Sequence, residues 1–104
     1  MDEPMDVEEI TVEEAKKLHE EDQVVFIDVR DPYSYKGGHI DGAVNLSDAN
    51  VRNYIESGDK TKKHIIYCYH GHSSLGGAAY FKENGYSDSV SMRGGYAEWS
   101  RLDQ

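Results

Sequence analysis

Residues 64–74 read His-Ile-Ile-Tyr-Cys-Tyr-His-Gly-His-Ser-Ser. The apolar, partly β-branched start of this stretch, residues 64–68, predicts a buried strand. After a polar loop, the spacing of apolar residues from Ser74 onward predicts a helix that ends at Asn84-Gly85. A strand, a short loop and a helix make up the repeating unit of parallel α/β sheets, so this stretch indicates the fold class.

The same alternation of strands and helices continues on both sides of this stretch. Short apolar runs predict further strands at residues 24–29, 42–46 and 89–92. Helices are predicted from the capping box that begins at Thr11 to about Glu21, from Ser47 or Asp48 to Ile55, and from Tyr96 to Leu102. We therefore expect a single three-layer α/β domain, with a mostly parallel sheet of about five strands flanked by helices.

The charge of the chain is uneven. The 104 residues include 11 Lys and Arg against 20 Asp and Glu, a net charge of −9, which disfavours nucleic acid and anionic membrane surfaces as partners. Ten of the acids lie in residues 1–22, so we expect residues 1–9 to be an acidic, disordered tail and residues 10–104 to be the domain. Lys60 to Arg93 carries five bases and two acids, which predicts a mildly basic face around the site.

The sequence also bears on the compartment. The acidic first residues do not resemble a signal peptide, and the apolar runs are far shorter than the roughly 20 residues that span a bilayer. The single cysteine, Cys68, excludes a disulfide within the chain. These features predict a cytoplasmic protein.

Cys68 is the leading candidate for a catalytic residue. It follows a predicted strand and precedes a predicted helix, which is where ligands bind in open α/β sheets. The loop amides, with Gly71 free to adopt positive φ, and the helix N-terminus favour a bound anion and a thiolate. The alternative is a buried core cysteine, which leaves the polar run after Cys68 unexplained.

Several reactions use a cysteine in such a loop. A phosphatase of the Cys-x5-Arg type needs arginine at position 74, which is serine here. A thiol protease would need His70 or His72 in a geometry that this short loop does not suggest, and a metal site from His64, Cys68, His70 and His72 matches no usual zinc spacing. Sulfur transfer through a cysteine persulfide needs only the thiolate and an anion-binding loop, so we favour it.

Four segments of the chain together resemble the rhodanese family, and most closely its single-domain bacterial thiosulfate sulfurtransferases. The resemblance runs from about Ile10 to Leu102. The segments that carry it are Asp28-Val29-Arg30, Gly38-His39-Ile40-Asp41-Gly42-Ala43-Val44-Asn45, Cys68-Tyr69-His70-Gly71-His72-Ser73-Ser74 and Gly94-Gly95-Tyr96-Ala97-Glu98-Trp99. Each segment alone would be a weak signal, and the combination is specific.

The resemblance implies a double displacement in which Cys68 carries a persulfide, with no cofactor and no metal. Thiosulfate would be the donor, and cyanide or a dithiol such as reduced thioredoxin the acceptor. The loop that would hold the sulfur consists of Tyr69, His70, Gly71, His72, Ser73 and Ser74. Ser73 and Ser74 either donate hydroxyl hydrogen bonds or include the N-cap of the next helix, and the sequence does not decide between these two roles.

The remaining signature residues have structural explanations. Asp28 and Arg30 are expected to support the loop, with Arg30 paired to a nearby carboxylate. Tyr96 and Trp99 are expected to pack in the core, and His39 with Asp41 to form a buried, hydrogen-bonded turn. A second interpretation of the whole chain is a non-catalytic rhodanese-like module that binds a partner through its acidic N-terminal segment or relays sulfur within a complex.

Overall fold

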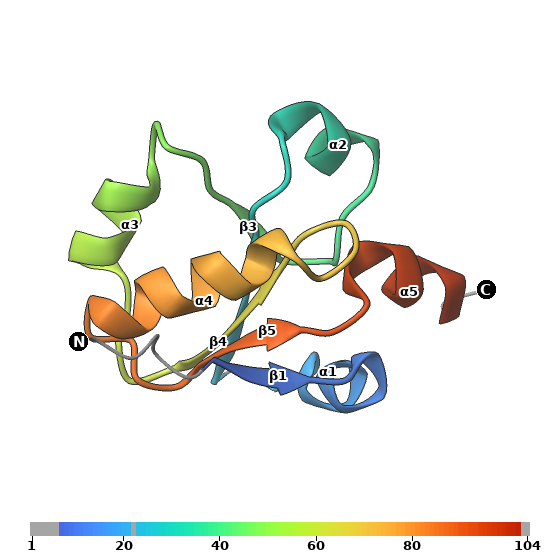
Figure 1. Cartoon of the computed structure of the whole chain (residues 1–104), viewed down its shortest axis with the longest axis horizontal. Coiled ribbons are helices and arrows are strands. Elements are labelled where there is room, and N and C mark those ends of the chain that lie inside the picture. Colours follow the sequence, from blue (N-terminus) through green and yellow to red (C-terminus); the bar gives the residue numbers. More distant parts are fainter. Residues whose placement is uncertain (1–6, 22, 103–104) are drawn as a thin grey trace, which may run out of the picture.

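A computed structural model describes residues 7–21 and 23–102 (Figure 1). Strands and helices alternate along the chain, as the sequence predicts. Their order is β1 (Glu8–Ile10), α1 (Val12–Leu18), β2 (Val24–Asp28), α2 (Pro32–Gly37), β3 (Val44–Asn45), α3 (Val51–Ser57), β4 (Lys63–Tyr67), α4 (Ser73–Glu83), β5 (Ser89–Met92) and α5 (Gly95–Leu102).

The five strands form one parallel sheet in the order β1-β5-β4-β2-β3. Helices cover both faces, with α3 and α4 on one side and α1 and α5 on the other (Figure 1). Each face has its own apolar core. One is built around Phe26, Ile65 and Trp99, and the other around Ile66 and Phe81. The predicted three-layer α/β fold with a parallel sheet is confirmed.

Strand β1 corrects the expected domain boundary. Glu8 and Glu9, which we assigned to the acidic tail, pair with Val90 and Ser91 of β5 at the edge of the sheet. Their side chains are exposed and only Ile10 is buried, so a strand this short lacks the apolar pattern that sequence analysis detects. The rest of the predicted tail, residues 1–6, lies outside the described residues.

Helix α2 is the second element that the sequence analysis did not predict. Sequence analysis assigned no helix to Asp31 and Pro32, which follow the strand predicted at residues 24–29. In the structure Asp31 is an N-cap whose carboxylate accepts a hydrogen bond from the amide of Ser34 at 2.9 Å, and Pro32 takes the first helical position. Proline is favoured there because that position has no partner for an amide hydrogen.

Two predicted helix boundaries also shift. Helix α1 ends at Leu18 rather than near Glu21, although its predicted capping box between Thr11 and Glu14 is present. Helix α3 begins at Val51, after Asn50, rather than after Ser47 or Asp48.

No described helix is long and apolar enough to cross a membrane.

The expected basic face around the site is not formed. Lys60, Lys62 and Lys63 lie before or at the amino end of β4, whereas Cys68 follows its carboxyl end. Five residues of strand separate the two ends by roughly 16 Å. Arg93, which follows β5, is at the same edge as Cys68 and is paired with Glu9. Sequence proximity was misleading because a strand carries its two ends to opposite edges of the sheet.

Candidate active site

The sulfur of Cys68 lies in a nest of hydrogen-bond donors at the carboxyl edge of the sheet. Cys68 directly follows β4, which is the central strand, and Cys68 is only 5 % exposed. Its Sγ accepts hydrogen bonds from the amides of Gly71, at 3.1 Å, and Ser74, at 3.3 Å. The following helix, α4, is 11 residues long and begins at this sulfur, so its N-terminal dipole adds to the positive potential there.

The balance of these contacts favours the thiolate. Burial raises the pKa of the Cys68 thiol, because it disfavours a charged sulfur. Hydrogen bonds from the side chains of Ser73 and Ser74 and from the amides of Ser74 and Gly71 lower the pKa by more, to about 7. A substantial fraction of Cys68 is therefore ionised at neutral pH, in contrast to an inert core cysteine.

The other residues of the loop differ in exposure. Gly71 and Ser74 are buried beside the sulfur, whereas Tyr69, His70, His72 and Ser73 are exposed. The exposed rings of Tyr69 and His70 lie 4.9 Å apart, between their centroids. His72 occupies the N-cap position of α4 and makes no side-chain capping bond, so neither serine is the N-cap.

The start of α5 holds the loop from the other side. The amides of Tyr96 and Ala97 donate hydrogen bonds to the carbonyl oxygens of Cys68, at 2.8 Å, and Tyr69, at 2.9 Å. These bonds fix the direction of the peptide units that begin the loop. In Figure 1 the yellow loop between β4 and α4 accordingly lies next to the start of α5.

Glycine is required at the contact between the loop and α5. Gly95 has a φ of 64°, and a Cβ there would lie 2.7 Å from the carbonyl oxygen of Cys68 and still closer to that of Tyr69. Gly71 has a φ of 95°, and its Cβ would lie 2.9 Å from the amide nitrogen of Gly94. Side chains at these positions would push the loop away from α5.

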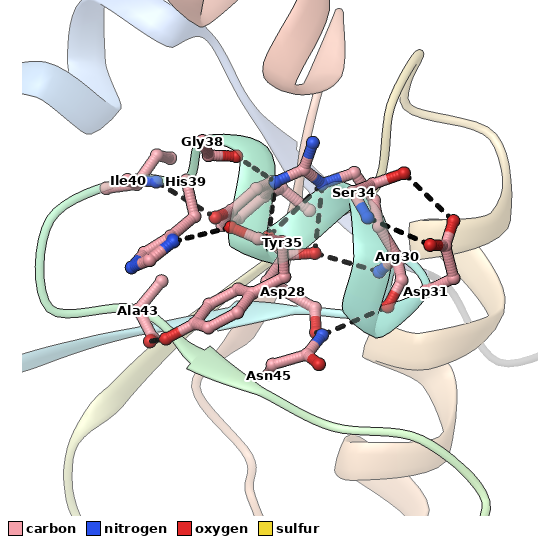
Figure 2. Close-up of polar contacts among 11 residues, drawn as sticks. Asp28, Arg30, Asp31, Ser34, Tyr35, Gly38, His39, Ile40, Ala43 and Asn45 are labelled. Carbon is pink, nitrogen blue, oxygen red and sulfur yellow. Dashed lines mark hydrogen bonds and ion pairs between the residues drawn. The ribbon is translucent and has the colours of Figure 1, made fainter.

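Asp28 and Arg30 form a buried ion pair at the carboxyl end of β2. The guanidinium Nη2 lies 2.7 Å from Asp28 Oδ2, and both side chains are at most 6 % exposed. The same Nη2 donates to the carbonyl oxygen of Gly38 at 2.7 Å (Figure 2). Asn45 donates to the carbonyl oxygens of Asp28 and Arg30, which ties the end of β2 to β3.

This ion pair reaches the cysteine loop through α5. The Arg30 guanidinium lies over the ring of Tyr96, 4.3 Å from its centroid, and the amide of Tyr96 holds the Cys68 carbonyl. The geometry brings Asp28 and Arg30 behind the loop rather than into contact with the sulfur. Tyr96 is thus a packing residue that also holds the loop, while Trp99 is buried in the core.

Replacing Arg30 by methionine is expected to lower the free energy of unfolding by roughly 3–5 kcal/mol, because it leaves the Asp28 carboxylate buried without its partner. Chemical denaturation of the variant and the wild type measures this loss. Lys63→Met is a matched control, since it breaks a partly exposed ion pair with Asp88 and is expected to cost less than about 1 kcal/mol. Equal losses in the two variants would contradict the structural role of Arg30.

The described histidines do not gather into the metal site that the sequence spacing disfavoured, and the turn expected at His39 is not formed. His64 lies in β4 with its ring bonded to Tyr54 and to the carbonyl of Lys62, well away from the Cys68 loop, so His64, Cys68, His70 and His72 do not gather as metal ligands. No group of three or more His, Cys, Asp or Glu residues in the described part of the chain is placed to hold a metal ion. His39 is exposed and bonds to the carbonyl of Tyr35 rather than forming a buried turn with Asp41.

A separate cleft of about 440 Å³ lies between α3, α4 and the ends of β2 and β3. Its lining residues are Val29, Leu46, Ser47, Asp48, Val51, Arg52, Gly77 and Tyr80. None of them belongs to the loop of residues 69–74, so this cleft is distinct from the sulfur nest.

Comparison with known proteins identifies the family. The family model of the rhodanese-like domain matches residues 11–102, which is nearly the whole chain. The chain belongs to the rhodanese family. A thiosulfate sulfurtransferase GlpE from Pseudoalteromonas translucida is 41 % identical over 90 residues, covering 86 % of each chain. A thiosulfate sulfurtransferase GlpE from Shewanella oneidensis is 37 % identical over 90 residues, covering 86 % of this chain and 89 % of that protein.

Solved structures of rhodanese domains share the fold. A rhodanese-like domain protein from Staphylococcus aureus is 28 % identical, with a TM-score of 0.79 over 89 % of this chain and 91 % of the other. A rhodanese-related protein from Thermoplasma volcanium is 21 % identical and superimposes with a TM-score of 0.80, over 91 % of this chain and 92 % of the other. The second likeness concerns the fold alone.

The site of this rhodanese domain contains contacts that the sequence analysis missed. In the sequence analysis Gly95 is only part of a segment that resembles the family, and its role in seating the loop follows from the contact of α5 with Tyr69. Ser91, in β5, was read only as part of a strand, yet its hydroxyl lies next to that of Ser74. The available sequence signal is weak: a polar serine between Val90 and Met92 in a predicted strand, which Ser89 of the same strand also resembles.

Proposed function

We propose that this rhodanese domain is a thiosulfate sulfurtransferase that carries sulfane sulfur as a persulfide on Cys68 and passes it to cyanide or to a thiol acceptor. The observation that carries the proposal is the hydrogen-bonded sulfur of Cys68, held by loop amides with a pKa lowered to about 7. The names of the GlpE relatives support thiosulfate as the donor.

The first step is attack of the Cys68 thiolate on the outer sulfur of thiosulfate. A sulfur–sulfur bond forms to Sγ, the bond between the outer sulfur and the sulfonate breaks, and sulfite leaves with the bonding electron pair. The amides of Gly71 and Ser74 and the N-terminus of α4 offset the negative charge of the incoming dianion and of the persulfide. The fraction of Cys68 that is already ionised near pH 7 needs no general base.

The second step releases the sulfur. A cyanide carbon or an acceptor thiolate attacks the outer sulfur of the persulfide, the bond to Sγ breaks, and Cys68 leaves as the thiolate. The products are thiocyanate or a persulfide on the acceptor. With a dithiol such as reduced thioredoxin, the second thiolate would then attack the inner sulfur of that persulfide, which forms a disulfide and releases hydrosulfide. The same donors that favour the thiolate make Cys68 a good leaving group in this step.

The proposed function is tested by intact-protein mass spectrometry after incubation with thiosulfate. The mass should rise by one sulfur atom, the added sulfur should map to the peptide that contains Cys68, and cyanide should remove it with formation of thiocyanate. A wild-type protein that gains no sulfur would refute the proposal. The other interpretation, a non-catalytic docking module, predicts this negative result.

The reactivity of Cys68 should depend on pH in a defined way. Its pKa is lowered, so the thiolate predominates above about pH 7 and is lost as the pH falls below that value. The rate of alkylation by iodoacetamide is expected to rise with pH to a plateau, with a midpoint of about 7. A midpoint near the ordinary thiol value of about 8.5 would contradict the hydrogen-bonded thiolate.

A further inference from the structure

A chain of three buried heteroatoms leads from the catalytic sulfur into the sheet. Cys68 Sγ lies 3.4 Å from Ser74 Oγ, and Ser74 Oγ lies 2.7 Å from Ser91 Oγ. Both serines are fully buried. Cys68 follows β4, Ser74 is in the first turn of α4, and Ser91 is in β5, so three separate elements meet in this chain.

Serine at position 91 is not explained by packing. Ser91 lies between Val90 and Met92 in a strand whose residues are all buried, where an apolar side chain would fit the core better. Among the described residues, the only hydrogen bond of its hydroxyl is the one with Ser74. The Ser91 hydroxyl is therefore connected to the Cys68 sulfur through Ser74.

The hydrogen-bonded set of Cys68, Ser74 and Ser91 holds one proton more when Cys68 is a thiol than when it is a thiolate. With the thiolate, Ser91 donates to Ser74 and Ser74 donates to the sulfur, so both hydroxyl protons have acceptors. With the thiol, three protons share two hydrogen bonds, so one of them is left without an acceptor among these three atoms. A buried donor without an acceptor is unfavourable, so the hydrogen-bonded set of Cys68, Ser74 and Ser91 favours the ionised sulfur.

We propose that Ser91 is a positioning residue that directs the hydroxyl proton of Ser74 onto the sulfur of Cys68 and so favours its thiolate. By donating to Ser74 Oγ, Ser91 orients the Ser74 hydroxyl and polarises it into a stronger donor. The inference rests on the proposed function, in which the Cys68 thiolate is the nucleophile. It adds to the cysteine loop a residue 17 positions away from Ser74 in the chain.

Charged and titratable groups lie on the elements packed around Cys68. They come from the loop, the end of β2, the turn after β5, and α5. These residues are His70, His72, Asp28, Arg30, Arg93 and Glu98. None of them is altered by a substitution at Ser91, so a comparison of serine variants isolates the contribution of the hydroxyl.

The test is the pH profile of iodoacetamide alkylation in the full-length Ser91→Ala protein. The midpoint should rise by roughly half a pH unit, which lowers the rate at pH 6 about threefold. Ser89→Ala is the matched control, because Ser89 is also fully buried in β5 but bonds to the carbonyl of Tyr86. Its midpoint should equal that of the wild type, and Ser91→Thr, which retains a hydroxyl, should restore the wild-type value.

A double-mutant cycle tests the route through Ser74. In a Ser74→Ala background, Ser91→Ala should cause no further shift of the midpoint, because the intermediate hydroxyl is already missing. An unchanged midpoint in Ser91→Ala, an equal shift in Ser89→Ala, or a shift that persists without the Ser74 hydroxyl would each overturn the inference. A wild-type protein that forms no persulfide would refute the proposed function. The alkylation profiles of the serine variants would still test the role of Ser91, because alkylation requires no thiosulfate.

Discussion

A Cys68→Ser protein is expected to take up no sulfur from thiosulfate and to lose its sulfurtransferase turnover by roughly a thousandfold or more. Cys68 is the only cysteine in the chain, so no second thiol can accept the sulfur. A serine hydroxyl stays protonated in this nest at neutral pH, and oxygen is a poor nucleophile toward sulfane sulfur. The measurement is thiocyanate formation in the presence of thiosulfate and cyanide.

The loss in Cys68→Ser should not come from unfolding. Serine is close to cysteine in size, and its oxygen can accept the amide hydrogen bonds that Gly71 and Ser74 now give to sulfur. Thermal unfolding should therefore occur within a few degrees of the wild-type temperature. A folded Cys68→Ser protein that still produced thiocyanate would show that another group carries the sulfur.

Gly95→Ala is expected to reduce turnover by roughly a hundredfold or more, because it displaces the loop that holds the sulfur. The added Cβ would lie 2.7 Å from the carbonyl oxygen of Cys68, and the φ of 64° disfavours any residue with a side chain. The left-handed conformation alone costs about 1–2 kcal/mol, so the unfolding temperature should also fall by roughly 10 °C. Turnover and thermal unfolding are measured on the same preparation.

The effect of Gly95→Ala on the sulfur is separable from its effect on stability. If the loop moves away from α5, the amides of Gly71 and Ser74 lose their alignment and the pKa of Cys68 should rise toward its ordinary value. Gly76→Ala is the matched control, since Gly76 lies in α4 with open space around its position and should be neutral or stabilising. A Gly95→Ala protein with the wild-type alkylation profile would contradict the role assigned to this contact.

The elements that the sequence predicted well are those whose pattern is local. Each of these elements is predicted by residues only a few positions apart. The signals are the apolar residues of β2 and β4, the capping box at Thr11 and the glycine after α4. The position of Cys68 between a strand and a helix belongs to the same class. Helix α2 was missed although its signal, Asp31 followed by proline, is also local, because that pair equally suits a turn.

The sequence by itself determined the parallel α/β fold and the family, and it singled out Cys68 as the candidate nucleophile, because periodicity and motif spacing lie within short segments. Only the tertiary structure decided what surrounds the sulfur. It separated Lys60 and its neighbours from the site by the length of β4, seated the loop on Gly95, and placed Ser91 against Ser74. These contacts join residues from different strands and helices, and no pattern along one segment encodes the distance between side chains that meet only after the sheet has formed.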